Sequence, residues 1–335
     1  MKKKRVLTGI TTTGTPHLGN YIGAIKPAVY ASQSDQIESF FFLADYHALI
    51  KTQDKGLVHQ STKEVAACWL ALGLDTKKAV FYRQSDIPEI PELTWLLTCM
   101  TAKGLMNRAH AYKSMVQDNS EAGEDADHGI TMGLFSYPIL MAADILMFNA
   151  QVIPVGRDQV QHVEMARDIA QRFNHHYGTY FELPTAQIDE SHGTLMGVDG
   201  RKMSKSYQNT IPIFLSEKQL RKHINRIKTN LLEPGEPKDT KTSVIFQLWK
   251  AFATHEQIQE MSDQFASGIA WGEAKHLLFE LINHRLREPR ERYNEFMANP
   301  AQIESVLVDG AERARQRSID FMKELRASVG IQSLS

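Results

Sequence analysis

Short apolar segments alternate with segments of helical periodicity in the first part of this chain, and this alternation constrains the fold most strongly. Residues 5–10, the phenylalanine-rich run that ends at Asp45, and residues 79–84 each predict a buried β-strand. Helical patterns over about residues 18–33 and 55–72 separate these strands. Strands that alternate with helices in this way predict an α/β fold built on a Rossmann-like, doubly wound parallel sheet.

The pattern changes twice further along the chain. Residues 88–150 predict helices inserted into the sheet, interrupted by an acidic stretch at 116–129 for which we expect a mobile loop. A strand pattern resumes at 151–155, and afterwards mostly helical patterns remain. We therefore expect an α/β domain over residues 1–206, followed by an all-helical domain over residues 207–335.

Composition and charge narrow the class of protein. With 335 residues, 42% of them hydrophobic and 23% charged, the chain can bury a sizeable core. Because the formal net charge is −1, a basic surface that binds nucleic acid must be confined to one part of the molecule. Cys68 and Cys99 lie in apolar helical contexts without a CxxC pattern, which predicts two buried free thiols. The polar N-terminus and the lack of an apolar run of about 20 residues predict a cytoplasmic protein without a membrane partner.

A glycine- and threonine-rich turn follows the first predicted strand and leads into a helix. Such a helix start is an anion site, because unpaired backbone N–H groups and the positive end of the helix dipole point to one place. Gly19 lets a ligand approach closely, and His17 and Asn20 present polar side chains at the helix start. The sequence matches neither the Walker A nor the GxGxxG pattern. In isolation, the same residues could simply cap a helix.

A second polar segment, Lys-Met-Ser-Lys-Ser, stands at residues 202–206. Its two lysines, three residues apart and spaced by small hydroxyl residues, make a flexible cationic strip. Such a strip can follow a polyphosphate as negative charge moves onto a leaving group. Taken alone, a segment of this composition is also typical of a solvated surface turn.

Together, the two segments resemble the signature motifs of class I aminoacyl-tRNA synthetases, which commonly read HIGH and KMSKS. The fourth position of the first motif is Asn20 here, a variant found in the tyrosine and tryptophan subclass. The resemblance implies an enzyme that uses ATP to form an aminoacyl-adenylate and then loads tRNA. It also implies that His17 and Asn20 act on the phosphates, and that Lys202, Ser204 and Lys205 act on the departing pyrophosphate.

The resemblance is closest to bacterial tryptophanyl-tRNA synthetases, and it covers nearly the whole chain through residues 136–146 and 152–159. Asp144 is the one carboxylate on an otherwise apolar helix. A buried carboxylate is costly without a donor, and the indole N–H of tryptophan can only donate. A surface carboxylate paired with a local arginine is the alternative for Asp144. Tyrosine enzymes of the subclass carry a different sequence around their specificity carboxylate.

The resemblance implies further contacts with each substrate. We expect tryptophan to be bound by Asp144, Met141, Tyr137, His47, Ile153, Val155 and Gln159. We expect ATP to be bound by Thr11, Thr12, Thr13, Gly19, Asn20, Lys113, Gly156, Arg157, Asp158, Leu195, Lys202, Met203, Ser204, Lys205 and Ser206. Two positions depart from the family, which often has Gln at Thr11 and Glu at Arg157. Asp158 could equally cap the helix that follows it.

Cofactor and partners follow from the same resemblance. Mg²⁺ should accompany ATP, without a metal site built by the protein itself. We expect tRNA(Trp) to contact the basic segments 218–228 and 284–292, and a homodimer to form through the helices of residues 88–150. The alternatives are a tyrosine-specific synthetase, a small-molecule adenylyltransferase, and a catalytically silent tRNA-binding paralogue.

Overall fold

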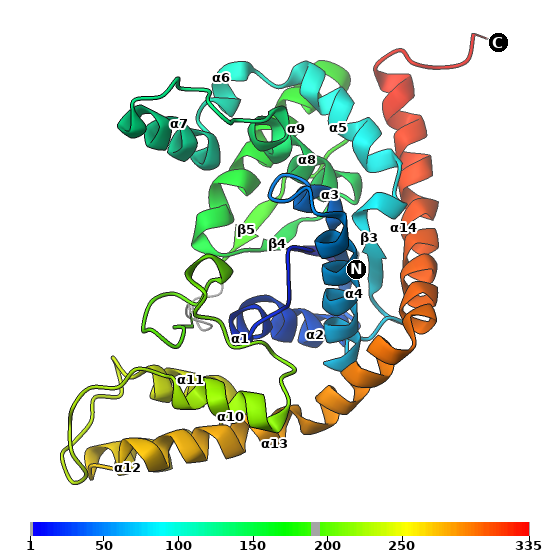
Figure 1. Ribbon diagram of the computed structural model, residues 1–335. Coiled ribbons are helices and arrows are strands. Elements are labelled where there is room, and N and C mark those ends of the chain that lie inside the picture. Colours follow the sequence, from blue (N-terminus) through cyan, green and yellow to red (C-terminus); the bar gives the residue numbers. More distant parts are fainter. Residues whose placement is uncertain (1–2, 189–194, 335) are drawn as a thin grey trace.

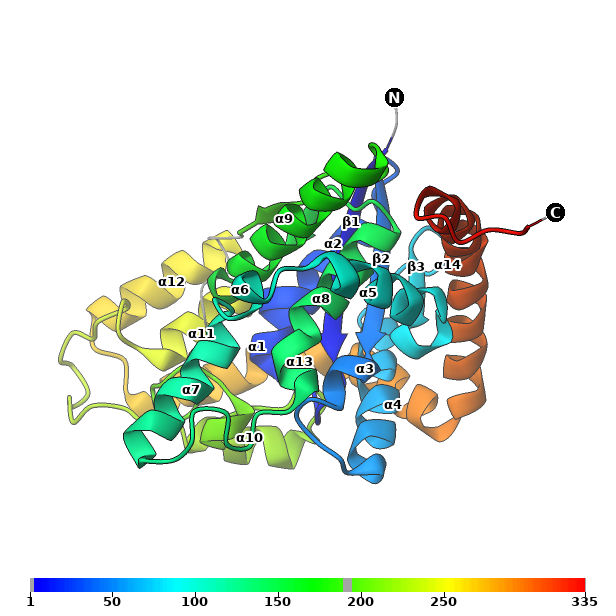
Figure 2. The same ribbon diagram turned by 90° about the horizontal axis from the view of Figure 1, so that it is seen from above.

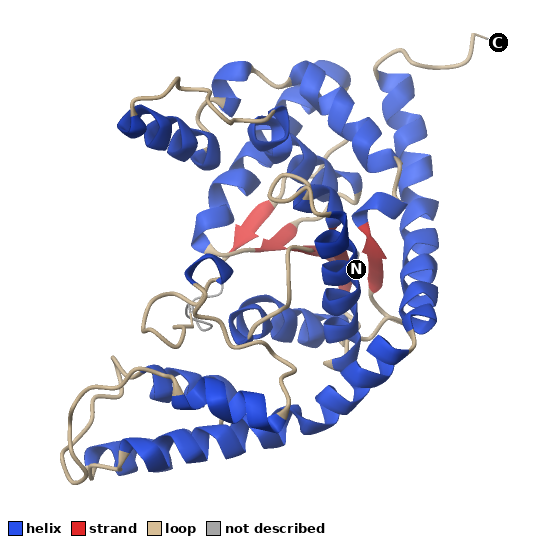
Figure 3. Cartoon of the chain, in the orientation of Figure 1, coloured by secondary structure: helices blue, strands red, loops and turns tan. Residues whose placement is uncertain are grey.

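A five-stranded parallel sheet lies at the centre of the computed structural model, which describes residues 3–188 and 195–334 (Figures 1 and 3). The strand order is β3-β2-β1-β4-β5. The strands are β1 (Lys4–Thr11), β2 (Ile37–Ala44), β3 (Val80–Arg83), β4 (Val152–Pro154) and β5 (Thr185–Gln187). The predicted doubly wound parallel sheet is therefore confirmed, although the three-residue strand β5 was not foreseen.

Side chains of β2 alternate between two hydrophobic cores, as successive residues of a strand must. Phe41 and Leu43 join the core on the side of α2 (Lys26–Ser32) and α4 (Lys55–Ala71). Phe40 and Phe42 join the core on the other side, with α5 (Glu89–Met100), α8 (Met132–Met147) and α9 (Val160–Tyr177). Burial on both faces explains why β2 is apolar at successive positions rather than alternately.

The segment between β1 and β2, predicted as one kinked helix, is divided into three pieces: α1 (Leu18–Asn20), the π-helical η1 (Tyr21–Ile25) and α2. Pro27 lies in the first turn of α2. Proline lacks an N–H and clashes with the preceding turn, so the regular α-helical hydrogen bonding is interrupted just before it.

The helical insertion between β3 and β4 corrects two predictions. It contains η2 (Gln84–Asp86), α5, α6 (Lys103–Met106), α7 (His110–Ala122) and α8. The acidic stretch predicted as a loop from residue 116 continues α7 to Ala122, because acidic residues do not by themselves break a helix. Gly123, with φ 74°, ends the helix in a left-handed conformation. Cys68 is buried as expected, whereas Cys99 is exposed.

The last part of the chain is helical, as predicted. It contains α10 (Glu217–Asn225), α11 (Val244–Phe252), α12 (His255–Ala266), α13 (Trp271–Ala298) and α14 (Pro300–Ser328). Helix α14 leaves the other four and returns along β3, at the edge of the sheet (Figure 2). A Cβ atom on Gly310 would lie 1.8 Å from the carbonyl oxygen of Phe81, so this contact requires glycine. The division at residue 206 stays a prediction, and α14 packs with the α/β part.

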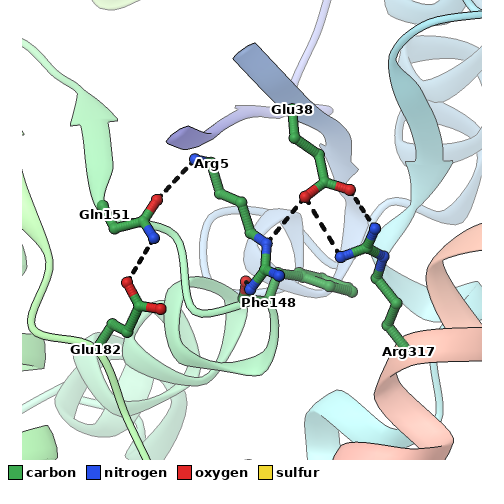
Figure 4. Close-up of polar contacts among 6 residues, drawn as sticks. All are labelled: Arg5, Glu38, Phe148, Gln151, Glu182 and Arg317. Carbon is green, nitrogen blue, oxygen red and sulfur yellow. Dashed lines mark hydrogen bonds and ion pairs between the residues drawn. The ribbon is translucent and has the colours of Figure 1, made fainter. Parts of the chain in front are cut away.

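Polar contacts fasten α14 to the start of the sheet (Figure 4). Glu38 of β2 accepts hydrogen bonds from Arg317 of α14 and from Nε of Arg5 in β1, the latter at 2.9 Å. The Arg5 guanidinium also donates to the carbonyl oxygen of Phe148 at 3.0 Å. Because Glu38 joins two arginines from distant segments, it links the N-terminal ends of the strands to the last helix. The described helices include none with the length and hydrophobicity of a membrane span.

Candidate active site

Two adjoining cavities open at the carboxyl ends of β1 and β4, where open parallel sheets bind their ligands. The first has a volume of about 610 Å³ and lies against α8, and the second has a volume of about 890 Å³ and lies against residues 202–206. Their shared wall includes Thr11, Asn20, Lys51 and Gly156. A ligand in one cavity can therefore touch a ligand in the other.

Asp144 lines the first cavity, and its side chain is fully buried. The Gln84 amide donates to Asp144 Oδ1 at 2.8 Å and to Oδ2 at 3.0 Å, and His47 Nε2 lies 2.9 Å from Oδ2. Burial raises the pKa of Asp144, and the contacts with His47 and Gln84 oppose this rise. A carboxylate has about four accepting positions, so three contacts leave capacity for one further donor. The surface pairing with arginine that the sequence left open is wrong.

The walls around Asp144 are mostly apolar and include a few polar side chains. Met141, Ile153 and Val155 line the same cavity, together with Tyr137, His47 and Gln159. His162, which the sequence analysis missed, lies between Tyr137 and Gln159: its Nε2 is 2.8 Å from the Tyr137 hydroxyl and its Nδ1 is 2.9 Å from Gln159 Oε1.

The tautomer of His162 follows from these contacts. The Gln159 oxygen can only accept, so Nδ1–H must donate to it and Nε2 must accept from the Tyr137 hydroxyl. Burial lowers the pKa of His162, which favours this neutral form. The phenol oxygen of Tyr137 is thereby left to accept a hydrogen bond from an ammonium group in the cavity.

His17 and Asn20 line the second cavity and also cap the helix start. The Asn20 side-chain oxygen accepts from the His17 N–H at 3.1 Å, and His17 Nδ1 accepts from the Asn20 N–H at 3.4 Å. Burial, followed by the charge of Lys205, lowers the pKa of His17 to about 4. A neutral imidazole that accepts at Nδ1 carries its proton on Nε2, so His17 can still donate to an anion. The capping role that the sequence left open is therefore present and compatible with ligand binding.

Residues 202–206 also line the second cavity. Lys205 Nζ donates to the carbonyl oxygens of Thr13 at 2.9 Å and Gly14 at 2.7 Å, so the two motifs meet although about 190 residues separate them. Burial lowers the pKa of Lys205 to about 8; nearby Glu64 raises it and Lys51 lowers it. The buried Asn209 accepts from the Ser204 N–H at 2.8 Å and donates to the Lys202 carbonyl at 3.0 Å, which fixes the loop.

The remaining predicted ATP contacts fall into two groups. The second cavity is lined by Thr11, Thr13, Gly19, Gly156, Leu195, Lys202, Met203, Ser204, Lys205 and Ser206. Neither cavity is lined by the other four predicted residues, Thr12, Lys113, Arg157 and Asp158. Thr12 is buried, and Lys113 is exposed on α7. Asp158 lies inside the short helix η3 (Arg157–Gln159), and the position before α9 is Gln159, so the capping alternative for Asp158 is wrong.

Sequence reasoning missed Gln84 and Lys51, which the structure brings to the site. Gln84 is fully buried and follows β3 directly, and Lys51 follows β2 after the short helix α3 (Asp45–Ala48). The carboxyl ends of parallel strands meet at one edge of a sheet. Gln84 is the last residue of the predicted strand 79–84, so a systematic search for polar residues at strand ends would have found it.

Comparison with known proteins adds independent findings. Residues 1–287 match the model of a family described as tRNA synthetases class I (W and Y). The chain is 60% identical over 335 residues to the tryptophan–tRNA ligase of Neisseria meningitidis, with all of both chains covered. It is 61% identical over 333 residues to that of Pseudomonas aeruginosa, covering 98% of this chain and 74% of the relative.

Solved structures show the same likeness. The tryptophanyl-tRNA synthetase of Campylobacter jejuni, complexed with ADP and tryptophan, aligns with a TM-score of 0.86 and 43% identity, covering 97% of this chain and 99% of that one. The tyrosyl-tRNA synthetase of Archaeoglobus fulgidus aligns with a TM-score of 0.64 and 20% identity, covering 87% and 90%, which supports the shared fold alone.

Proposed function

The chain belongs to the class I tRNA synthetases for tryptophan and tyrosine, and we infer from its site that it is the ligase that joins tryptophan to tRNA(Trp). It uses ATP to convert L-tryptophan to tryptophanyl-adenylate and then transfers the aminoacyl group to tRNA. The observation that carries the choice of tryptophan is the buried Asp144 carboxylate, which has spare accepting capacity in an apolar cavity. An indole N–H supplies the missing donor.

Pyrophosphate exchange into ATP, measured with each amino acid in turn, tests this function. We expect exchange that depends on tryptophan and not on tyrosine or phenylalanine. Charging of tRNA(Trp) by the same preparation separates a ligase from an adenylyltransferase and from a silent paralogue. Exchange stimulated by tyrosine instead would overturn the assignment of the amino acid.

In the first step, a carboxylate oxygen of tryptophan attacks the α-phosphorus of ATP, and the bond to the bridging oxygen breaks as pyrophosphate leaves with the electron pair. The attacking carboxylate is already ionised at neutral pH, so no general base is needed. The protein supplies positioning and charge stabilisation. We assign the α-ammonium group to Tyr137 and Gln159, the phosphates to His17 Nε2–H and Asn20, and the departing pyrophosphate to Lys202, Ser204 and Lys205. Leu195 and Met203, both buried beside the second cavity, suit the adenine.

Mg²⁺ enters this scheme with ATP. The ion usually keeps several waters and binds through the oxygens of substrate phosphates. Hydroxyl groups of Ser204 and Ser206, 2.8 Å apart on the wall of the second cavity, suit hydrogen bonds to such waters. The ion supplies charge neutralisation at the phosphates.

Lys205 gives the proposal a pH dependence. Its pKa of about 8 in the free enzyme means that the ammonium charge is present below this pH and lost as the pH rises through it. We expect kcat/KM for ATP, which reports the free enzyme, to fall on this alkaline limb. Arginine stays charged over this range, so Lys205→Arg should shift the fall in kcat/KM to higher pH. Pyrophosphate exchange between pH 7 and 10 measures both, and an unmoved limb would assign the titration to another group.

The transfer step requires a surface for tRNA, which we place on the helical part of the chain, residues 207–335. Lys218, Arg221, Lys222 and Arg226 are exposed on or just after α10, where phosphates can reach them. The second basic segment is partly structural, because Arg292 Nε donates to the carbonyl of Ala71 at 2.9 Å. Its exposed arginines Arg285 and Arg287 remain candidates, and charging should weaken steeply with salt.

We further propose that the chain forms a homodimer through α5 and the start of α8. Trp95 and Met132 expose 66% and 72% of their surface there, and Leu49 nearby exposes 58%. Beside them lies a cavity of about 440 Å³, lined by residues such as Leu49, Pro91 and Leu140. Large exposed apolar groups gathered at one place mark association surfaces.

Trp95→Asp is expected to weaken this dimer strongly. Central tryptophans at interfaces contribute about 2 kcal/mol or more, so the dissociation constant should rise about 30-fold or more. Analytical ultracentrifugation should then find a species near the chain mass of 37.9 kDa. Tyr30→Asp, at a residue 64% exposed on α2, is the matched control and should leave association unchanged. Equal association of Trp95→Asp and wild type would place the interface elsewhere.

A further inference from the structure

Lys51 occupies a place in the site that no other lysine or arginine shares among the described residues. It lines both cavities, whereas Lys202 and Lys205 line the second one only. On the proposed function each cavity holds one of the two substrates, so the tryptophan carboxylate meets the α-phosphate at the wall common to the two cavities. Among the described lysines and arginines, Lys51 is the one that lines this common wall.

The Lys51 ammonium is available for a ligand. The side chain is exposed and makes no hydrogen bond or ion pair with any residue that the structure describes. Its backbone is fixed, because the Lys51 N–H donates to the carbonyl oxygen of Ala48 at 2.9 Å, at the end of α3. The same short helix carries His47, whose Nε2 lies 2.9 Å from Asp144. One rigid turn thus carries both a contact to the specificity carboxylate and the free cation.

The chemistry of the step needs a positive charge at this point. Two anions, a carboxylate and a phosphodiester, must come into contact, and negative charge increases on the α-phosphate oxygens as the new bond forms. A cation placed there stabilises the transition state more than either separate substrate. His47, the other basic group of the first cavity, is engaged with Asp144.

We propose that the Lys51 ammonium contacts the α-phosphate of ATP and the tryptophan carboxylate where they react, as a further catalytic residue for adenylate formation. This inference rests on the proposed function. It differs from the roles assigned to Lys202 and Lys205, which act on the leaving pyrophosphate. Lys51 acts on the groups between which the new bond forms.

Lys51→Met tests the proposal, because methionine keeps the length of the side chain and removes the charge. We expect kcat for tryptophan-dependent pyrophosphate exchange to fall about 100-fold, the scale seen when one transition-state donor is removed. Tryptophan binding without ATP, measured by calorimetry, should change less than about threefold, because the indole and ammonium contacts remain. Lys51→Arg should recover most of the rate. Lys55→Met, an exposed lysine at the start of α4 outside both cavities, is the control with unchanged rate.

Three results would overturn the proposal. The first is a Lys51→Met exchange rate within about threefold of wild type. The second is a loss of tryptophan binding as large as the loss of rate, which would indicate a structural role. The third is an unchanged exchange rate with a raised KM for tRNA, which would place Lys51 on the acceptor end. Wild-type enzyme without tryptophan-dependent exchange would instead sink the proposed function itself, so the two failures are distinguishable.

Discussion

Asp144→Ala is expected to lower kcat/KM for tryptophan by about 10- to 150-fold, because a hydrogen bond to a charged group contributes about 1.5–3 kcal/mol. The variant also leaves the Gln84 amide and His47 without their acceptor, so the value lies toward the upper end of this range. Phenylalanine has no indole N–H, so the variant removes no hydrogen bond from it and its activation should change less. The preference for tryptophan over phenylalanine should therefore fall by a similar factor.

Pyrophosphate exchange with each amino acid measures this selectivity. The KM for ATP shows whether ATP binding in the neighbouring cavity is affected. We expect the KM for ATP to change less than about threefold, because Asp144 lines only the first cavity. Asp86→Ala removes a carboxylate that pairs with Arg83 outside both cavities and serves as the control. If ATP and tryptophan kinetics deteriorated equally, Asp144 would be a structural residue rather than the one that recognises the indole.

Local patterns in the sequence were sufficient to predict four of the five strands, and only the short edge strand β5 was missed. The apolar run before Asp45 could only be a strand covered on both faces, and β2 ends at Ala44 as expected. Gly123 shows where local reasoning failed. The acidic composition around it predicts a loop from residue 116, whereas the helix continues until the glycine stops it. Acidity indicates exposure to solvent, and exposure is compatible with a helix.

Contacts between distant segments were harder to predict, because they depend on tertiary packing. The position of Gln84 at the end of a strand indicates the edge of the sheet, but its partner appears only when β3 places its amide 2.8 Å from Asp144. The return of α14 along β3 depends similarly on Gly310, whose close approach to Phe81 no helical periodicity reveals. Motif residues such as His17 were found because their chemistry is local to one turn.

Removing both cations of the 202–206 loop, as Lys202→Met with Lys205→Met, is expected to lower kcat for tryptophan activation by about 10³-fold or more. Loss of a single donor to developing charge costs about 10²–10³-fold, and both lysines serve the same departing pyrophosphate. Lys205 also holds the first turn through Thr13 and Gly14, so its loss loosens the contact between the two motifs. Tryptophan affinity should be nearly unchanged, because neither lysine lines the first cavity.

The two chemical steps should separate in this variant. Pyrophosphate has left before transfer begins, so the rate of transfer from preformed tryptophanyl-adenylate to tRNA should fall far less than the rate of exchange. Rapid-quench measurement of each step in a single turnover tests this difference. Lys55→Met with Lys77→Met removes the same charge from exposed positions of the α/β part outside both cavities and should leave both steps unchanged. Equal slowing of activation and transfer in the loop variant would mean that the lysines organise the whole site rather than stabilise the leaving group.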